Sequence, residues 1–286
     1  MGWPSAAAYG LPVDRMVLPG GFHALVCGDP AARPLVFLHG FPDHPPNALP
    51  FLVELARTHR VIAPWLRGYA PSPLDGPFHL DTLASDLVGW LEVLGGAVDV
   101  VGHDWGAAIT YAVCATAPAR VRRAVTMALP HPLTFLRSLR TGSQLRRSWY
   151  IALFQLPNAE RMVRARDLGM IDHLWRTWSP GFTLDEARRA ELHECLAKSL
   201  PGPLGYYRAM LRPLTGFRGR MRKLAGRIPV PILQLHGAAD GCVLPPDTSD
   251  ARRFDERVLE IVPDAGHFLH LEQPAATAAR VAAWLA

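Results

Sequence analysis

The sequence lacks an apolar run long enough to cross a bilayer, which predicts no membrane span. Residues 1–20 are interrupted by Pro4, Pro12 and Pro19 and have no basic start followed by an apolar stretch, so we expect no signal peptide. The four cysteines form no CxxC pair, which argues against a disulfide framework or a zinc site. These absences favour a protein of the reducing cytoplasm.

Acidic residues are scarce in one part of the chain. Residues 131–227 contain 7 of the 25 Asp and Glu residues but 18 of the 30 Lys and Arg residues, so this segment is basic between acidic flanks. The charges are dispersed and follow no nucleic-acid-binding motif, so we expect no nucleic-acid partner. We interpret them as a solvated helical surface, with mild steering of anionic substrates as the alternative.

Short β-rich runs alternate with helical patterns at both ends of the sequence. This order predicts an α/β protein with a mostly parallel sheet flanked by helices. Asp81 is the expected N-cap of a helix that continues to Leu94, and further helices are expected over 107–117 and 274–286. The expected strands are Val13–Leu18, Phe22–Cys27, Pro34–Leu38, Arg60–Pro64, Val98–Val101, Ala124–Leu129, Pro231–Leu235 and Val258–Val262.

The middle of the chain shows helical patterns without a convincing strand. We therefore predict an all-helical insertion, or cap, over residues 132–217. The α/β core then consists of residues 1–131 and 218–286.

The motif GHDWG at 102–106 follows the apolar run VDVV and begins a helical pattern. It has the form Gly-x-nucleophile-x-Gly, in which the glycines permit a sharp turn that exposes the central side chain. The usual serine is absent, since no GxSxG motif occurs anywhere, and Asp104 takes its place. The alternative is an ordinary strand–turn–helix in which Asp104 only caps the helix.

Further motifs follow three other expected strands. HGFP at 39–42 lies where an oxyanion-hole loop is expected, Asp240 follows the run PILQL, and His267 follows the last strand. The order nucleophile, acid and histidine is that of α/β-hydrolases. Asp104, Asp240 and His267 are therefore the predicted catalytic triad.

These residues carry a resemblance to the α/β-hydrolase-fold epoxide hydrolases, the microbial relatives of the soluble epoxide hydrolase. The matching segments, which span nearly the whole chain, are HGFP at 39–42, RGY at 67–69, GHDWGA at 102–107, GAAD at 237–240 and GHF at 266–268. The resemblance implies the α/β-hydrolase fold. The sequence departs from the family pattern at DHPPN (43–47), which we expect to reshape the pocket entrance, and at Trp65, where an Asp is common.

The resemblance also implies two cap tyrosines that bind the epoxide oxygen. Tyr150 matches the first, and Tyr207 matches the second, with Tyr206 as the fallback because adjacent tyrosines leave the register open. A tyrosine with its usual pKa of about 10 stays protonated at neutral pH and can donate to the oxygen that leaves.

An aspartate nucleophile restricts the chemistry. A carboxylate that attacks saturated carbon forms an ester, which His267, oriented by Asp240, would hydrolyse with an activated water. The backbone N–H groups of Phe41 and Trp105 are the predicted oxyanion hole. The side chains expected to line the pocket are Trp105, Phe41, Pro42 and Phe268.

We therefore predict an epoxide hydrolase that forms vicinal diols from hydrophobic epoxides and water, needs no cofactor or metal, acts in detoxification, and is a monomer or homodimer. The first alternative is a haloalkane or haloacid dehalogenase with the same nucleophile. Trp105 suits halide binding, but Phe41 takes the place where a second halide donor is common, and the two tyrosines favour the epoxide. The second alternative is a non-catalytic binding protein with the hydrolase fold.

Overall fold

The computed structural model describes residues 11–211, 219, 222 and 224–286. Its centre is an eight-stranded sheet with the order β1-β2-β4-β3-β5-β6-β7-β8, in which β1 and β2 are antiparallel to their neighbours and the other pairs are parallel. The strands are β1 (Val13–Leu18), β2 (Phe22–Cys27), β3 (Pro34–Leu38), β4 (Arg60–Pro64), β5 (Val98–His103), β6 (Val121–Met127), β7 (Ile232–Gly237) and β8 (Arg257–Val262). The predicted mostly parallel sheet is confirmed.

The central strands are apolar because helices cover both faces of the sheet. Every residue of β5 and β7 is buried. The ends of the strands were harder to predict. The sequence predicted that β6 begins at Ala124, but it begins at Val121. Its early residue Arg122 is charged, but it donates to the buried Asp99 of β5 at 2.8 and 2.9 Å, which allows the strand to include it.

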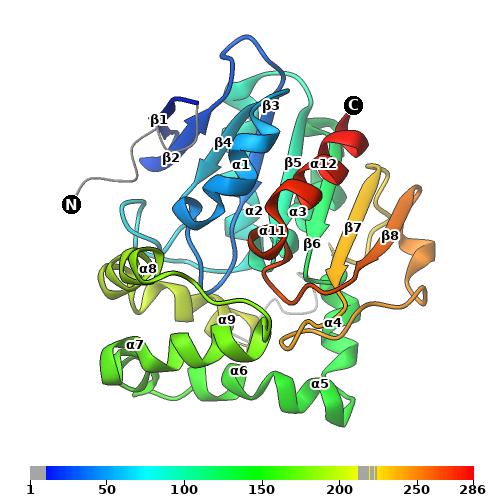
Figure 1. Cartoon of the computed structure of the whole chain (residues 1–286). Helices are drawn as coiled ribbons and strands as arrows, with labels where there is room; N and C mark the ends of the chain where they lie inside the picture. The colour runs from blue at the N-terminus through cyan, green and yellow to red at the C-terminus, as the bar shows by residue number, and fades with distance from the viewer. Residues whose placement is uncertain (1–10, 212–218, 220–221, 223) are drawn as a thin grey trace.

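Helices α1 (Leu49–Leu55) and α12 (Pro274–Leu285) pack side by side in front of the sheet in Figure 1. Helices α2 (Leu80–Leu94) and α3 (Trp105–Thr116) form a second pair, and the short α11 (Leu269–Glu272) precedes α12. The prediction of Asp81 as the N-cap of α2 is wrong. The helix begins at Leu80 with His79 as its cap, and Asp81 lies in the first turn, where a carboxylate favours the helix dipole.

A helical segment separates β6 from β7. It contains α4 (Pro132–Ser138), α5 (Gly142–Arg147), α6 (Trp149–Phe154), α7 (Ala159–Trp178), α8 (Glu186–Ser199) and α9 (Gly202–Leu211), and α7 is interrupted by non-helical backbone at 165–168. We call residues 132–211 the cap segment, and Figure 1 shows it beyond the carboxyl ends of the parallel strands. The predicted helical insertion is confirmed. Its predicted end at residue 217 lies outside the described residues, so the division into two domains stays a prediction.

Short 3-10 helices complete the chain at η2 (Pro45–Ala48), η3 (Pro118–Arg120) and η4 (Ala251–Arg253). Among the residues that the structure describes, no helix combines the length and the apolar character needed to cross a membrane.

Candidate active site

Asp104 occupies a sharp turn between β5 and α3. Its backbone has φ 51° and ψ −114°, a conformation that costs energy for a residue other than glycine. A Cβ atom at Gly102 would collide with the backbone of Gly106, and one at Gly106 would collide with the backbone of Leu38. Both glycines of the motif are therefore required by the close approach of the chain. The Asp104 side chain makes no capping hydrogen bond to α3, so the alternative of a simple helix cap does not hold.

The Asp104 carboxylate faces the loop that follows β3. Its Oδ1 accepts a hydrogen bond of 2.8 Å from the backbone N–H of Phe41, and the side chain is buried. Gly40 has no room for a side chain, because a Cβ atom there would collide with the Asp104 side chain. The Phe41 N–H thus lies at the carboxylate. The oxyanion-hole roles of the Phe41 and Trp105 N–H groups stay predictions.

His267 and Asp240 complete a connected set with Asp104. The Nδ1 of His267 lies 2.9 Å from Oδ2 of Asp240, and its Nε2 lies 3.7 Å from Oδ2 of Asp104. The Asp240 Oδ1 accepts hydrogen bonds from the backbone N–H groups of Cys242 and Val243, at 2.7 and 2.9 Å. All three predicted residues therefore come together on loops at the carboxyl ends of β5, β7 and β8.

The two carboxylates control the charge of His267. Burial alone would lower the pKa of its imidazole, but the charges of Asp240 and Asp104 outweigh burial and raise the pKa to about 10. Burial would raise the pKa of Asp240, but His267 and hydrogen bonds to its carboxylate lower it well below its usual value. With Asp104 unmodified, His267 is accordingly an imidazolium between two carboxylates.

The two tyrosines chosen from the sequence approach each other across the pocket. The rings of Tyr150, on α6, and Tyr207, on α9, have centroids 5.5 Å apart, and both side chains are buried. The Tyr150 hydroxyl lies 3.4 Å from the Cys242 sulfur. The Tyr207 hydroxyl makes no hydrogen bond of normal length within the described residues, although Trp105 and Tyr150 are close enough to affect its pKa.

Tyr206 is oriented differently from its neighbour. Its hydroxyl donates a hydrogen bond of 2.6 Å to the backbone oxygen of Arg67, and its ring stacks on Phe78. The structure therefore leaves Tyr207, and not Tyr206, with an available hydroxyl.

The cavity above Asp104 is lined mainly by apolar side chains from the core and the cap segment. Of the predicted lining residues it includes Trp105, whereas Phe41 packs against Phe154 and Tyr207, and Phe268 stacks on Trp175 with ring centroids 3.6 Å apart. Phe41, Pro42 and Phe268 are not among the described lining residues. The lining comprises Phe78, His79, Leu80, Asp81, Asp104, Trp105, Ala108, Leu129, Pro132, Phe135, Leu136, Tyr150, Ile151, Tyr206, Tyr207, Ala209, Met210, Leu224 and Val243.

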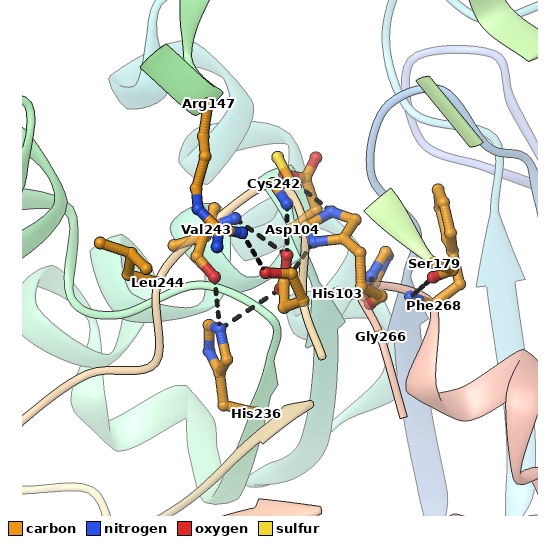
Figure 2. Close-up of polar contacts among 12 residues, drawn as sticks. His103, Asp104, Arg147, Ser179, His236, Cys242, Val243, Leu244, Gly266 and Phe268 are labelled. Carbon is orange, nitrogen blue, oxygen red and sulfur yellow. Dashed lines mark hydrogen bonds and ion pairs between the residues drawn. The ribbon is translucent and has the colours of Figure 1, made fainter. Parts of the chain in front are cut away.

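Sequence reasoning missed the side chains of α5 that hold the loop after Asp240. Gln144 donates to the backbone oxygen of Cys242 and accepts from the N–H of Leu244, both at 2.9 Å. Arg147 donates to the backbone oxygen of Asp240 at 2.6 Å, and Figure 2 shows it extending from the cap segment to this loop. No local pattern identifies these residues, because their partners are about a hundred positions away.

Buried histidines support the loops around the site. His39 accepts from the Leu66 N–H at 3.2 Å, and His103 donates to the backbone oxygen of His267 at 2.9 Å, so both histidines hold loop structure. Burial lowers the pKa of each to about 4. Within the described ranges, no three His, Cys, Asp or Glu side chains gather in a way that would hold a metal ion.

Comparisons with known proteins agree with this architecture. Residues 35–280 match the family model described as the alpha/beta hydrolase family. The chain is 30% identical to Epoxide hydrolase 3 of Xenopus tropicalis over 88% of its own length and 71% of that protein. It is 31% identical to Epoxide hydrolase 4 of Mus musculus over 65% of its own length and only 56% of that protein.

Solved structures add a similarity in three dimensions. One of them, described as a novel epoxide hydrolase from metagenomes of hot environments, has a TM-score of 0.80 and is 28% identical. The match covers 96% of this chain and 98% of that structure's chain. By its sequence, its sheet and its helical insertion, this chain belongs to the alpha/beta hydrolase family and is an enzyme related to the epoxide hydrolases.

Proposed function

We propose that this enzyme hydrolyses epoxides to vicinal diols through a covalent ester on Asp104. The observation that carries the proposal is the position of the Asp104 carboxylate, at the bottom of an apolar cavity whose lining also includes Tyr150 and Tyr207. A carboxylate nucleophile suits attack on saturated carbon, because attack on an ordinary ester carbonyl would give a reactive anhydride. The names of the relatives support the same reaction.

In the first half-reaction Asp104 opens the epoxide ring. The Phe41 N–H holds Oδ1, which leaves Oδ2 to form the bond to an epoxide carbon. The carbon–oxygen bond of the ring breaks, its electron pair moves to the oxygen, and a cap tyrosine protonates that oxygen. Burial and the Asp104 charge raise the pKa of Tyr207 well above 10, so its hydroxyl keeps its proton until the more basic alkoxide forms. Tyr150 binds the same oxygen from the other side.

Formation of the ester changes the state of His267. The ester is neutral, so one of the two charges that hold His267 protonated disappears, and the pKa of His267 falls. The imidazole then releases a proton to solvent and becomes able to act as a base, while Asp240 still orients it through Nδ1. His267 is therefore not available as a base before the ester forms, and it becomes available afterwards.

In the second half-reaction His267 removes a proton from water, and the water oxygen bonds to the carbonyl carbon of the ester. The Phe41 N–H, together with the Trp105 N–H in its predicted role, stabilises the oxyanion; loss of one such donor typically costs about 3 kcal/mol in barrier. The acyl–oxygen bond then breaks, and His267 protonates the diol oxygen. The acid proton of the regenerated Asp104 returns to the tyrosine. His267, again beside a charged Asp104, takes up a proton from solvent and becomes an imidazolium once more.

The apolar lining favours a neutral, hydrophobic epoxide as substrate. All four cysteines are free and buried, which fits the cytoplasmic location that we propose and a role in removing reactive epoxides there.

The test is a single turnover of excess enzyme with a racemic aryl epoxide in ¹⁸O-water. We expect unlabelled diol in the first turnover and the label in the peptide that contains Asp104, because water attacks the ester carbonyl. Labelled diol would contradict the ester route. No diol, together with halide release from haloalkanes, would favour the dehalogenase. Turnover of neither class, with ligand binding unchanged in Asp104→Ala, would favour the binding protein.

A further inference from the structure

The Asp240 carboxylate has a contact that the proposed reaction does not use. Besides the two backbone N–H groups at Oδ1 and His267 at Oδ2, the Nε2 of His236 lies 3.3 Å from Oδ2. His236 belongs to β7 and is fully buried. Figure 2 shows His236 and Arg147 on opposite sides of Val243, so this histidine approaches the loop from the sheet.

The partners of His236 define its tautomer. Its Nε2 lies between two acceptors, the backbone oxygen of Val243 at 3.0 Å and Oδ2 of Asp240, so this nitrogen carries the proton. Its Nδ1 is buried without a partner in the described part of the chain, and a second proton there would be an unpaired buried donor. The Nε2–H of His236 is therefore held at the backbone oxygen of Val243 and lies beside Oδ2 of Asp240.

We propose that His236 is a positioning residue, which holds Oδ2 of Asp240 toward His267 and thereby limits the basicity of His267. For its effect on catalysis this inference rests on the proposed function. The physical reason is that Oδ2 has the N–H groups of two imidazoles close by, Nδ1 of His267 at 2.9 Å and Nε2 of His236 at 3.3 Å. When one donor is removed, more of the carboxylate's negative charge acts on the other, so the pKa of His267 rises.

Other groups also act on His267 and stay unchanged when His236 is substituted. They are the Asp104 carboxylate at 3.7 Å, the His103 ring at a centroid distance of 5.0 Å, and His270, whose pKa His267 helps to lower. Arg147 contacts the backbone oxygen of Asp240 and not its carboxylate. A change in the titration of His267 on substitution of His236 therefore reports on the contact with Asp240.

The first test is independent of any reaction. The His267 ring nitrogens are titrated by NMR in the Asp104→Ala background, where loss of one carboxylate brings the pKa into an accessible range. We expect His236→Leu to raise the pKa of His267 by about one unit. His236→Gln, whose amide N–H can take the place of Nε2–H, should restore most of the original value. An unchanged pKa in His236→Leu would overturn the proposal.

The second test separates the two half-reactions with Asp104 intact. In single turnovers near neutral pH we expect His236→Leu to form the ester at the wild-type rate and to hydrolyse it about tenfold more slowly, with the acid limb of hydrolysis moved to higher pH. His236→Gln should behave like the wild type. Equal slowing of both steps, or a slower hydrolysis without a shifted limb, would indicate only a structural role and contradict the proposal.

Two controls keep the tests decisive. If His236→Leu does not fold, as judged by circular dichroism, His236→Asn replaces it, because the shorter amide does not reach Oδ2. If the wild type forms neither ester nor diol, the proposed function fails, while the titration in the absence of substrate still decides the role of His236.

Discussion

The Nε2 of His267 and the Oδ2 of Asp104 lie 3.7 Å apart, beyond a normal hydrogen bond but close enough for strong attraction between an imidazolium and a carboxylate. This separation links the protonation of the histidine to the chemical state of the aspartate. It also places the histidine next to the carbonyl that an ester on Asp104 would present.

The first prediction concerns this link. Asp104→Ala removes one of the two carboxylates that raise the pKa of His267 to about 10, so we expect the pKa to fall by at least one unit. The measurement is an NMR titration of the His267 ring in both proteins. A pKa that stays at the wild-type value would show that Asp104 does not hold the proton on His267, and the proposed change of state on ester formation would be lost.

The second prediction separates the adjacent tyrosines. Tyr207→Phe should slow ester formation by about 100-fold, since the phenol donates to the ring oxygen. Tyr206→Phe should leave ester formation near the wild-type rate and lower the free energy of unfolding by about 1 kcal/mol, because it loses the hydrogen bond to Arg67. Single-turnover kinetics and urea unfolding measure the two effects. The reverse pattern would make Tyr206 the donor.

The third prediction compares two glycines. In Gly40→Ala the new Cβ would collide with Asp104, so we expect the loop to move and activity to fall at least 100-fold. Gly89 lies within α2 with open space where a Cβ would be added, so Gly89→Ala should keep full activity and stabilise the fold by about 1 kcal/mol. Turnover and thermal unfolding of both variants provide the measurement. Full activity in Gly40→Ala would mean that the loop does not need this close approach.

The fourth prediction is acid sensitivity of the fold. Burial lowers the pKa of His39, His103 and His131 from 6.5 to about 4, so between these pH values the unfolded chain binds more protons than the folded chain. The stability from these neutral rings is fully present above pH 6.5 and decreases as the pH falls toward 4. We expect the melting temperature to be at least about 4 °C lower at pH 5 than at pH 7.5.

A variant of the N-cap of α4 provides the control for this effect. His131 accepts a hydrogen bond from the Leu133 N–H, and asparagine can take over that contact without titrating. In His131→Asn the loss of stability at low pH should be smaller than in the wild type. An equal loss would assign the acid sensitivity to other groups.

Much of this fold could be predicted from local sequence. The apolar runs of β3 and β4 and the motif around Asp104 are short, continuous patterns, and the turn itself needs Gly102 and Gly106. The proximity of Asp104, Asp240 and His267 was predictable because these residues follow strands in a fixed order. The start of β6 was not, because the charge of Arg122 is compensated only by Asp99, on a neighbouring strand.

The finer parts of the site depend on contacts between distant segments. Nothing in the sequence around His236 indicates that its ring approaches Asp240, or that Gln144 holds the loop after it. The cavity wall also includes Phe135 and Met210 from the cap segment. The way the cap segment packs on the core determines whether these side chains point into the cavity. Pro42 and Phe268 were expected on the wall because of their positions in motifs, and motif position alone does not determine the direction of a side chain.

The contacts between the cap segment and the loop after β7 limit how the cap can be exchanged. Gln144, Arg147 and Tyr150 all contact residues 240–242 or the N–H of Leu244, so the cap segment and the loop after β7 form one continuous contact surface. A chimera that imports a cap from a relative to change the substrate range would leave this loop with foreign partners. Residues 240–244 should therefore be transplanted together with the cap as a single exchangeable module.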